Sequence, residues 1–401
     1  MKEIAISGIG IISALGKNVE ENLQAVREKR SGLAKVHYLK TSHTEFPVGE
    51  VKMSNEEIIL SLALSEDAPT IRTSLMGMFA VREALCNSRL IQKSSEIMGK
   101  KIALISGTTV GGMDKSEQFY LDFLENDAKN AYISTHNCGA CTEMIADYFG
   151  IFSTVDTIST ACSSAANAIL FGAELLKSGR ADIVVAGGSE CIAKFHLNGF
   201  NTLKILDTEP SRPFDATRAG LNLGEGAAYV VMETTDSAEK RQVKPLCRLS
   251  GYANTCDAFH QTTSSPNGEG AFLAMKKALD NAGLVPHDID YINAHGTGTD
   301  NNDSSEGIAI MRLFGDKIPP VSSTKPFTGH TASAAGSVEA SICIFALKHN
   351  FIPVNLNFSE QMPELSFAPA TNDKPIKPMR HVMSNSFGFG GNNTSLIFSK
   401  I

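Results

Sequence analysis

Short runs of β-branched and apolar residues alternate along this chain with longer segments that carry helix signals. The short runs predict β-strands at Ile4–Ile6, Ile102–Ser106, Val155–Ile158, Ile183–Ala186, Ala228–Met232, Leu246–Gly251, Ile289–Ile292 and Ser395–Phe398. The longer segments predict α-helices at Val19–Glu28, Ser74–Cys86, Ser163–Lys177, Gly270–Ala282, Ser304–Phe314 and Thr331–His349. Strands that alternate with helices in this way are typical of an α/β fold.

The N-terminal stretch MKEIAISGIGIISALG has one lysine and an apolar run, as a signal peptide does. Glu3 interrupts the charged region, however, and Gly8 and Gly10 favour a strand followed by a turn. We therefore expect no signal peptide. Because no run of 18 apolar residues occurs, we also expect no membrane-spanning helix.

A weak internal repeat divides the chain into two halves. Residues 155–188 comprise a strand, a cysteine, an alanine-rich helix and a second strand; residues 319–354 follow a similar plan. In the second helix Ala335, Val338, Ile342 and Phe345 recur at helical spacing, as a buried stripe would. We therefore predict halves of residues 1–242, with the cysteine, and 243–401, with the histidines and lysine described below.

Composition and charge exclude several classes of protein. The chain has 401 residues, of which 42% are hydrophobic and 20% charged, as in an ordinary globular protein. A net charge of −7 without a long basic run argues against nucleic acid as a partner. The eight cysteines are scattered rather than arranged as a disulfide framework, so we expect a cytoplasmic protein.

One cysteine lies where a strand ends and a helix begins, in VDTISTACSSAANAIL. At a helix N-terminus, free N–H groups and the helix dipole favour thiolate and can lower the pKa of a thiol to about 3.5–7.5. Cys162 is therefore a candidate nucleophile. The alternative is a buried structural cysteine, which is the commoner case for a cysteine taken alone.

Three other stretches concentrate reactive side chains. In NAHGTGTDNND, His295 follows an apolar strand, and Thr297 and Thr299 place hydroxyls at alternate positions, suited to binding a polar chain. In SSTKPFTGHTASAAGSVEA, Lys325 and His330 lie on a glycine-containing loop. A histidine at a strand end is more often structural than catalytic, so neither histidine is assigned a role by itself.

The other two candidates are a glutamate and a backbone amide. Glu339 follows on the predicted helix and can face Lys325, although a lysine–glutamate pair is usually a solvated surface pair. In NSFGFGGNNTS, Gly388, Gly390 and Gly391 permit unusual backbone angles, so the N–H of Phe389 can point at a developing oxyanion; such a stretch is more often a simple turn. The joint occurrence of all three stretches with Cys162 is much less expected by chance than any one of them alone.

These motifs, taken together, resemble the elongating β-ketoacyl-acyl carrier protein synthases of the thiolase-like superfamily. The resemblance runs through TACSSA, GGSE, SRPFDATRAGLNLGEGAAYVVME, NAHGTGT, STKPFTGHTASAAG and NSFGFGGNN, over nearly the whole chain. It implies a five-layer α-β-α-β-α fold built from two similar halves, and usually a homodimer.

The resemblance also implies a role for each candidate residue. Cys162 matches the acyl-accepting nucleophile; His295 and His330 match the two active-site histidines. The other matches are Lys325 with its paired acid Glu339, the gating phenylalanine Phe389, whose N–H joins that of Cys162 in an oxyanion hole, the phosphopantetheine-binding Thr297 and Thr299, and the acyl-pocket residues Val110 and Met113.

The implied reaction transfers an acyl group to Cys162 and condenses it with malonyl-acyl carrier protein, with loss of CO₂, to make a β-ketoacyl chain two carbons longer. No cofactor is expected, because phosphopantetheine arrives on the carrier protein and the departing CO₂ generates the carbanion. Two histidines and a cysteine could suggest zinc, but the imidazoles are needed as N–H donors, so we expect no metal.

Three other functions are less well supported. A CoA-dependent thiolase needs a second catalytic cysteine near the C-terminal glycine-rich loop, and no cysteine follows Cys343. A non-catalytic, chain-length-determining partner in a ketosynthase heterodimer usually lacks the nucleophile, which is present here. An initiating synthase of the Cys-His-Asn type is also disfavoured, because His330 stands where the asparagine would be.

Several positions depart from the common fatty-acid pattern. Asp300, followed by Asn301 and Asn302, stands where proline is usual; Pro326 replaces a small polar residue; and Ala219 replaces an aspartate. These departures resemble ketosynthases of specialised pathways such as aryl polyene pigments, and they leave open whether the product is a fatty acid, a polyene or a polyketide.

Overall fold

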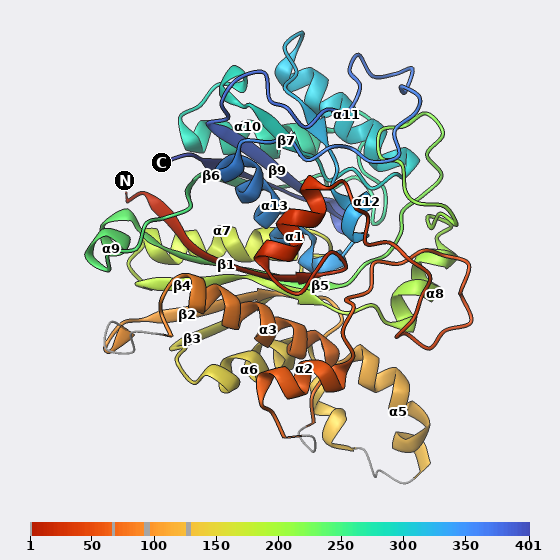
Figure 1. The fold of residues 1–401 in the computed structure, drawn as a ribbon. Helices are drawn as coiled ribbons and strands as arrows, with labels where there is room; N and C mark the ends of the chain where they lie inside the picture. Colours follow the sequence, from red (N-terminus) through yellow and green to blue (C-terminus); the bar gives the residue numbers. More distant parts are fainter. Residues whose placement is uncertain (1, 66–68, 92–96, 126–129) are drawn as a thin grey trace.

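The computed structural model describes residues 2–65, 69–91, 97–125 and 130–401, which form one ten-stranded sheet covered by helices (Figure 1). The strands are β1 (Ile4–Ser13), β2 (Ile102–Gly107), β3 (Thr154–Ile158), β4 (Ile183–Glu190), β5 (Gly226–Thr234), β6 (Cys247–Cys256), β7 (Tyr291–Asn293), β8 (Val321–Ser322), β9 (His381–Gly388) and β10 (Asn392–Ser399).

The order of the strands repeats in mirror image. It runs β3-β2-β4-β5-β1 in the first half and β6-β10-β9-β7-β8 in the second. The two halves meet where residues 4–6 of β1 pair antiparallel with residues 247–249 of β6. The predicted boundary after residue 242 falls between α9 (Thr235–Lys240) and β6, where the chain passes from one half to the other.

Helices form three of five layers (Figure 1). The α10–α11 pair covers the C-terminal strands, α13 and α7 fill the middle, and α3 and α6 cover the N-terminal strands. The bounds of these helices and of the others described, besides α9, are α1 (Val19–Arg27), α2 (Asn55–Leu62), α3 (Arg72–Asn87), α5 (Met113–Glu125), α6 (Cys138–Phe149), α7 (Ser164–Lys177), α8 (Lys194–Thr202), α10 (Glu269–Ala282), α11 (Asp300–Phe314), α12 (Lys325–Thr328) and α13 (Ala335–His349). This is the five-layer thiolase-like arrangement that the resemblance implied.

The central layer explains the small residues in the two repeated helices. Every residue of α13 from Ala335 to Leu347 is buried, and α7 is buried along most of its length. An ideal Cβ on Gly336 would lie 2.7 Å from the Cβ of Ala166, so the two helices can approach this closely only because the residues are small.

The prediction that Gly8 and Gly10 end the first strand is wrong. Strand β1 continues through both to Ser13, because these glycines face α3 rather than a turn. An ideal Cβ on Gly10 would lie 1.9 Å from the carbonyl oxygen of Ala80, and one on Gly8 would lie 2.5 Å from that of Ala84. The glycines therefore allow a helix to lie directly on the strand.

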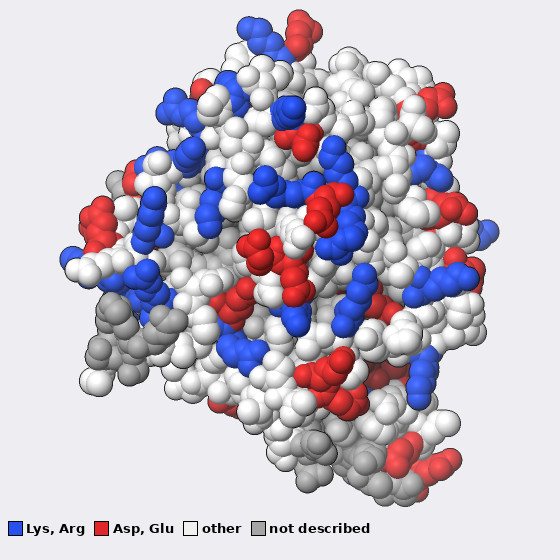
Figure 2. All heavy atoms as spheres, viewed as in Figure 1, with Lys and Arg blue, Asp and Glu red and all other residues white. Residues whose placement is uncertain are grey.

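Within the described ranges no helix is long and apolar enough to cross a bilayer. On the face shown in Figure 2, Lys and Arg side chains are interspersed with Asp and Glu rather than gathered into a basic stripe.

Candidate active site

A strained turn presents the cysteine at the end of β3. Ala161, directly before Cys162, has a φ of 51°, a left-handed conformation that a non-glycine residue adopts only at a cost. Hydrogen bonds hold the turn, since the Ser164 hydroxyl accepts from the N–H of Thr160 at 2.9 Å and donates to the carbonyl of Ala161 at 2.6 Å. The arrangement places a single reactive side chain at a fixed point between strand and helix.

The expectation of a lowered thiol pKa is wrong. Helix α7 begins at Ser164, with Ser163 as its N-cap, so Cys162 precedes the first free N–H groups of the helix. Its side chain is buried, and burial raises its pKa to about 11, although the charge of Lys325 and the N–H of Phe389 oppose the shift. The resting nucleophile is therefore a thiol and needs a base close at hand.

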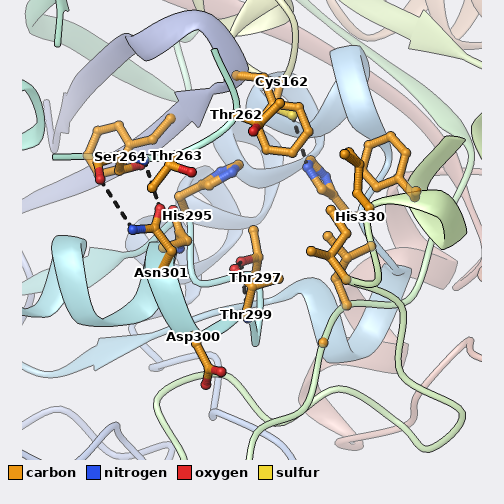
Figure 3. Close-up of a pocket in the computed structure, with 18 of the residues that line it drawn as sticks. Cys162, Thr262, Thr263, Ser264, His295, Thr297, Thr299, Asp300, Asn301 and His330 are labelled. Carbon is orange, nitrogen blue, oxygen red and sulfur yellow. Dashed lines mark hydrogen bonds between the residues drawn. The ribbon is translucent and has the colours of Figure 1, made fainter. Parts of the chain in front are cut away.

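Both histidines lie beside the sulfur and point toward it (Figure 3). The Nε2 of His330 is 3.1 Å from the Sγ of Cys162, and one nitrogen of each ring lies with that sulfur in a set whose members are all within 4.8 Å of one another. Burial, followed by the positive charge of Lys325, lowers the pKa of both imidazoles well below the usual value. Both rings are therefore neutral, and each can carry one N–H.

The lysine determines which nitrogen of His295 carries the proton. Its Nζ lies 3.3 Å from the Nδ1 of His295 and 2.5 Å from the backbone carbonyl of the same residue. An ammonium group can only donate, so Nδ1 must accept and the proton lies on Nε2. Lys325 thereby makes His295 an N–H donor on its Nε2 side.

The lysine and Glu339 form a buried pair, so the alternative of a solvated surface pair is wrong. Both residues are only 2% exposed, and the Nζ and Oε1 atoms lie 2.5 Å apart. Burial raises the pKa of Glu339 to about 7, while the neighbouring ammonium acts in the opposite direction. Glu339 holds Lys325 in place from the central helix α13.

The glycine-rich loop at the end of β9 brings a backbone donor to the sulfur. The N–H of Phe389 donates toward Cys162, and this contact lowers the pKa of the thiol. An ideal Cβ on Gly388 would lie 3.1 Å from the backbone nitrogen of Cys162, so the two loops are in close contact there. The Phe389 ring stacks on Phe200, with ring centroids 5.9 Å apart.

A cavity of about 310 Å³ is lined by Cys162, His295, His330 and Phe389 (Figure 3). Thr297 and Thr299 also line it, with their hydroxyl oxygens 2.8 Å apart, between the histidines and Asp300. The side chain of Asp300 is 89% exposed, which marks the mouth of the cavity. The structure therefore brings together eight of the ten predicted site residues. Six of them line the cavity, Lys325 contacts His295 beside it, and Glu339 holds Lys325 from the far side.

The two residues predicted for the acyl pocket do not line this cavity. Val110 is buried in the hydrophobic core of the N-terminal half, and Met113 begins α5 and packs against the same core. Their assignment to the acyl pocket stays a prediction.

Two carboxylates that the sequence analysis missed hold the histidine loop. Glu306 accepts hydrogen bonds from the N–H groups of His295 and Gly296 at 2.9 and 2.8 Å, and burial raises its pKa to about 7. Asp303 accepts the N–H of Thr297 at 2.9 Å. The signal available in the sequence was their spacing of three residues, which puts both acids on one face of α11 directly after the loop.

The donor set of one thiol and two imidazoles also resembles a zinc site. The ammonium of Lys325, however, already occupies Nδ1 of His295 and adds positive charge close to the chamber. A dication would be repelled there, so the side chains fit a site for a developing anion better than one for a metal.

The chain is similar over its full length to proteins of known activity. The "Beta-ketoacyl synthase, N-terminal domain" family matches residues 1–238, and the "Beta-ketoacyl synthase, C-terminal domain" family matches residues 246–359. The 3-oxoacyl-[acyl-carrier-protein] synthase 2 of Coxiella burnetii is 33% identical and aligns over 100% of this chain and 99% of that protein. The 3-oxoacyl-[acyl-carrier-protein] synthase 1 of Escherichia coli K12 is also 33% identical, with both chains fully covered.

Solved structures with the same fold extend the comparison. The ishigamide ketosynthase/chain length factor superposes with a TM-score of 0.92 at 29% identity, covering 100% of this chain and 99% of that one. One chain of the complex between a ketosynthase and its chain length factor from Xenorhabdus doucetiae superposes with a TM-score of 0.87 at 30% identity, covering 100% of this chain and 98% of that one.

Proposed function

The chain belongs to the β-ketoacyl synthase family, and from that premise we propose that it extends an acyl chain by two carbons in a decarboxylative Claisen condensation. The observation that carries the proposal is the meeting of the Cys162 sulfur with two neutral imidazoles and the Phe389 N–H in one cavity. We also propose that the acyl chain and the malonyl group reach the site as thioesters on a carrier protein.

In the first half-reaction the Cys162 sulfur attacks the acyl thioester carried by phosphopantetheine. Because the thiol pKa is raised to about 11, its proton must leave as the S–C bond forms, and the neutral Nε2 of His330 at 3.1 Å can receive it. The C–S bond to pantetheine breaks, and the departing thiolate takes the proton from His330. The Phe389 and Cys162 N–H groups stabilise the tetrahedral oxyanion, at about 2.7–4 kcal/mol for one such donor.

In the second half-reaction malonyl thioester loses CO₂, and the electron pair of the broken C–C bond forms an enolate. Its oxygen needs hydrogen-bond donors, and the Nε2–H of His295, fixed by Lys325, supplies one. His330 supplies the other from the opposite side of the chamber, once its proton is on Nε2. The enolate carbon attacks the acyl-Cys162 thioester, and the Cys162 thiolate that leaves takes up a proton from water.

Steady-state turnover tests this proposal. Purified protein, incubated with a panel of acyl-carrier proteins and malonyl-carrier protein, is expected to form β-ketoacyl-carrier products two carbons longer, detected by mass spectrometry. The Cys162→Ala variant is expected to form none. Product formation by that variant at the wild-type rate would contradict the mechanism.

We also propose that the enzyme acts as a dimer, either with a second copy or with a related subunit. Strand β3 is an edge of the sheet and is left partly exposed. Elsewhere on the surface of the same half, α5 has no buried residue and exposes Tyr120, Leu121 and Leu124. An unpaired edge strand and a helix with exposed apolar side chains each favour a protein partner. The complexes with chain length factors support the heterodimer as one form.

The fraction of homodimer can be measured by light scattering of the purified chain, and co-expression with a related subunit tests the heterodimer. The retained nucleophile argues against a non-catalytic role for this chain. Among the residues that line the described cavity, Cys162 is the one cysteine, so a thiolase reaction with two cysteines is not supported.

A further inference from the structure

A surface loop forms one wall of the active-site cavity. Residues 257–265 connect β6 to the segment before α10, and Thr262, Thr263 and Ser264 line the cavity. Most of this loop is exposed, and Phe259 at its tip is 55% exposed. Because so little of it is packed, its position depends on a few hydrogen bonds.

Asn301, in the first turn of α11, makes two of them. Its Oδ1 accepts from the N–H of Ser264 at 2.7 Å, and its Nδ2 donates to the carbonyl of the same residue at 3.2 Å (Figure 3). One amide side chain therefore holds both backbone groups of Ser264. The next anchor is the Ser305 hydroxyl, which donates to the carbonyl of Ser265 at 2.8 Å.

The same loop is bonded to the loop that carries the oxyanion donor. The N–H of Gly390 donates to the carbonyl of Gln261 at 2.7 Å, and the N–H of Asp257 donates to the carbonyl of Gly391 at 2.8 Å. Gly390 directly follows Phe389, whose N–H points at Cys162. Asn301 is thus connected to the nucleophile by hydrogen bonds at Ser264, Gln261 and Phe389 and by the short chain segments between them.

We propose that Asn301 is a positioning residue for acyl transfer: it fixes the 257–265 wall and, through it, the Phe389 N–H. This inference rests on the proposed function and deepens it. Asn301 directly follows Asp300, a position at which this chain departs from the common fatty-acid pattern. A residue at position 301 without an amide could not hold Ser264 in the same way.

The test compares Asn301→Ala, Asn301→Asp and Asn372→Ala with the wild type. Asn372 is a matched control, because its Oδ1 also accepts a backbone N–H, from Lys374 at 3.0 Å, but on an exposed loop that does not line the cavity. Two rates are measured for each protein: acylation of Cys162 by an acyl-carrier protein, followed by intact mass, and alkylation of Cys162 by iodoacetamide. Acylation develops an oxyanion that needs the aligned N–H, whereas alkylation develops none and depends on that N–H only through the pKa of the thiol.

We expect Asn301→Ala to reduce the acylation rate about tenfold or more, with a much smaller change in the alkylation rate. Asn301→Asp, which can still accept the Ser264 N–H but cannot donate to its carbonyl, should recover part of the loss. Asn372→Ala should match the wild type. Equal acylation by Asn301→Ala and wild type would overturn the inference, and so would equal losses in both rates. If the wild type itself forms no acyl-enzyme, the proposed function fails instead.

Discussion

The buried pair of Lys325 and Glu339 allows a quantitative prediction for Lys325→Met. Methionine fills a similar volume but leaves the Glu339 carboxyl without its partner, in a site where both residues are 2% exposed. Removing one member of a buried ion pair destabilises a protein by about 3–5 kcal/mol. We therefore expect the free energy of unfolding of Lys325→Met to be lower than that of the wild type by this amount near pH 8.

The loss should depend on pH in a definite direction. Burial raises the pKa of Glu339 above its usual 4.5, to about 7, so its favourable contribution is present below pH 4.5 and is lost as pH rises through about 7. Lys325→Met removes both effects of the lysine that lower this pKa, so the pKa of Glu339 in the variant lies higher still. Above pH 7 the folded variant keeps a proton that the unfolded chain has lost, and its stability falls by up to about 1.4 kcal/mol per pH unit relative to the wild type.

Urea unfolding followed by circular dichroism at pH 6, 7 and 8 measures both quantities. The double variant Lys325→Met with Glu339→Gln is the control, because it also lacks the lysine but has no titrating carboxyl at residue 339. It should regain part of the stability and lose the extra pH dependence. A difference between Lys325→Met and the wild type that is the same at pH 6 and pH 8 would refute the reasoning, since Glu339 would then not be its source.

Three further predictions concern the nucleophile, the histidine loop and the first strand. Iodoacetamide alkylation of Cys162, followed by mass spectrometry, should rise about tenfold per pH unit from pH 7 to pH 10, because the thiol pKa is raised to about 11; a plateau below pH 9 would contradict this. Glu306→Gln should lower condensation activity at pH 8 more than at pH 6, where the carboxyl with a pKa of about 7 is already protonated; equal effects at both pH values would count against it. Gly10→Ala should lower the free energy of unfolding by about 1–3 kcal/mol in urea titrations, because its Cβ would lie 1.9 Å from the Ala80 carbonyl oxygen; an unchanged midpoint would show that α3 can move away.

Patterning alone predicted the long, apolar elements well. The repeated helices α7 and α13 and the strands β2, β4 and β5 lie within a few residues of their predicted positions, because each is a continuous buried run bounded by turns. Strand β9 was not predicted, since its segment HVMSNSFG mixes serine and asparagine with apolar residues. Those polar side chains are buried because the strand leads into the active site.

The site was predicted in its reacting groups but not in its supports. Cys162, His295 and His330 became candidates through their joint occurrence, since each taken alone is more often structural, and their roles came from the resemblance to the ketosynthase family. The raised pKa of Cys162 could not be predicted, because it depends on how deeply the turn is buried. Glu306 and Asn301 were not assigned roles because they act on backbone groups of other loops, and such contacts exist only in the folded chain.

The most direct measurement is a pulse and chase on the acyl-enzyme. The purified chain is first incubated with acyl-carrier protein, and tandem mass spectrometry of the digested protein locates the acyl group; malonyl-carrier protein is then added. The account predicts a single acylated site at Cys162, whose acyl group disappears after the chase and reappears in a β-ketoacyl product two carbons longer. An acyl group on another residue, or one on Cys162 that malonyl-carrier protein does not remove, would contradict it.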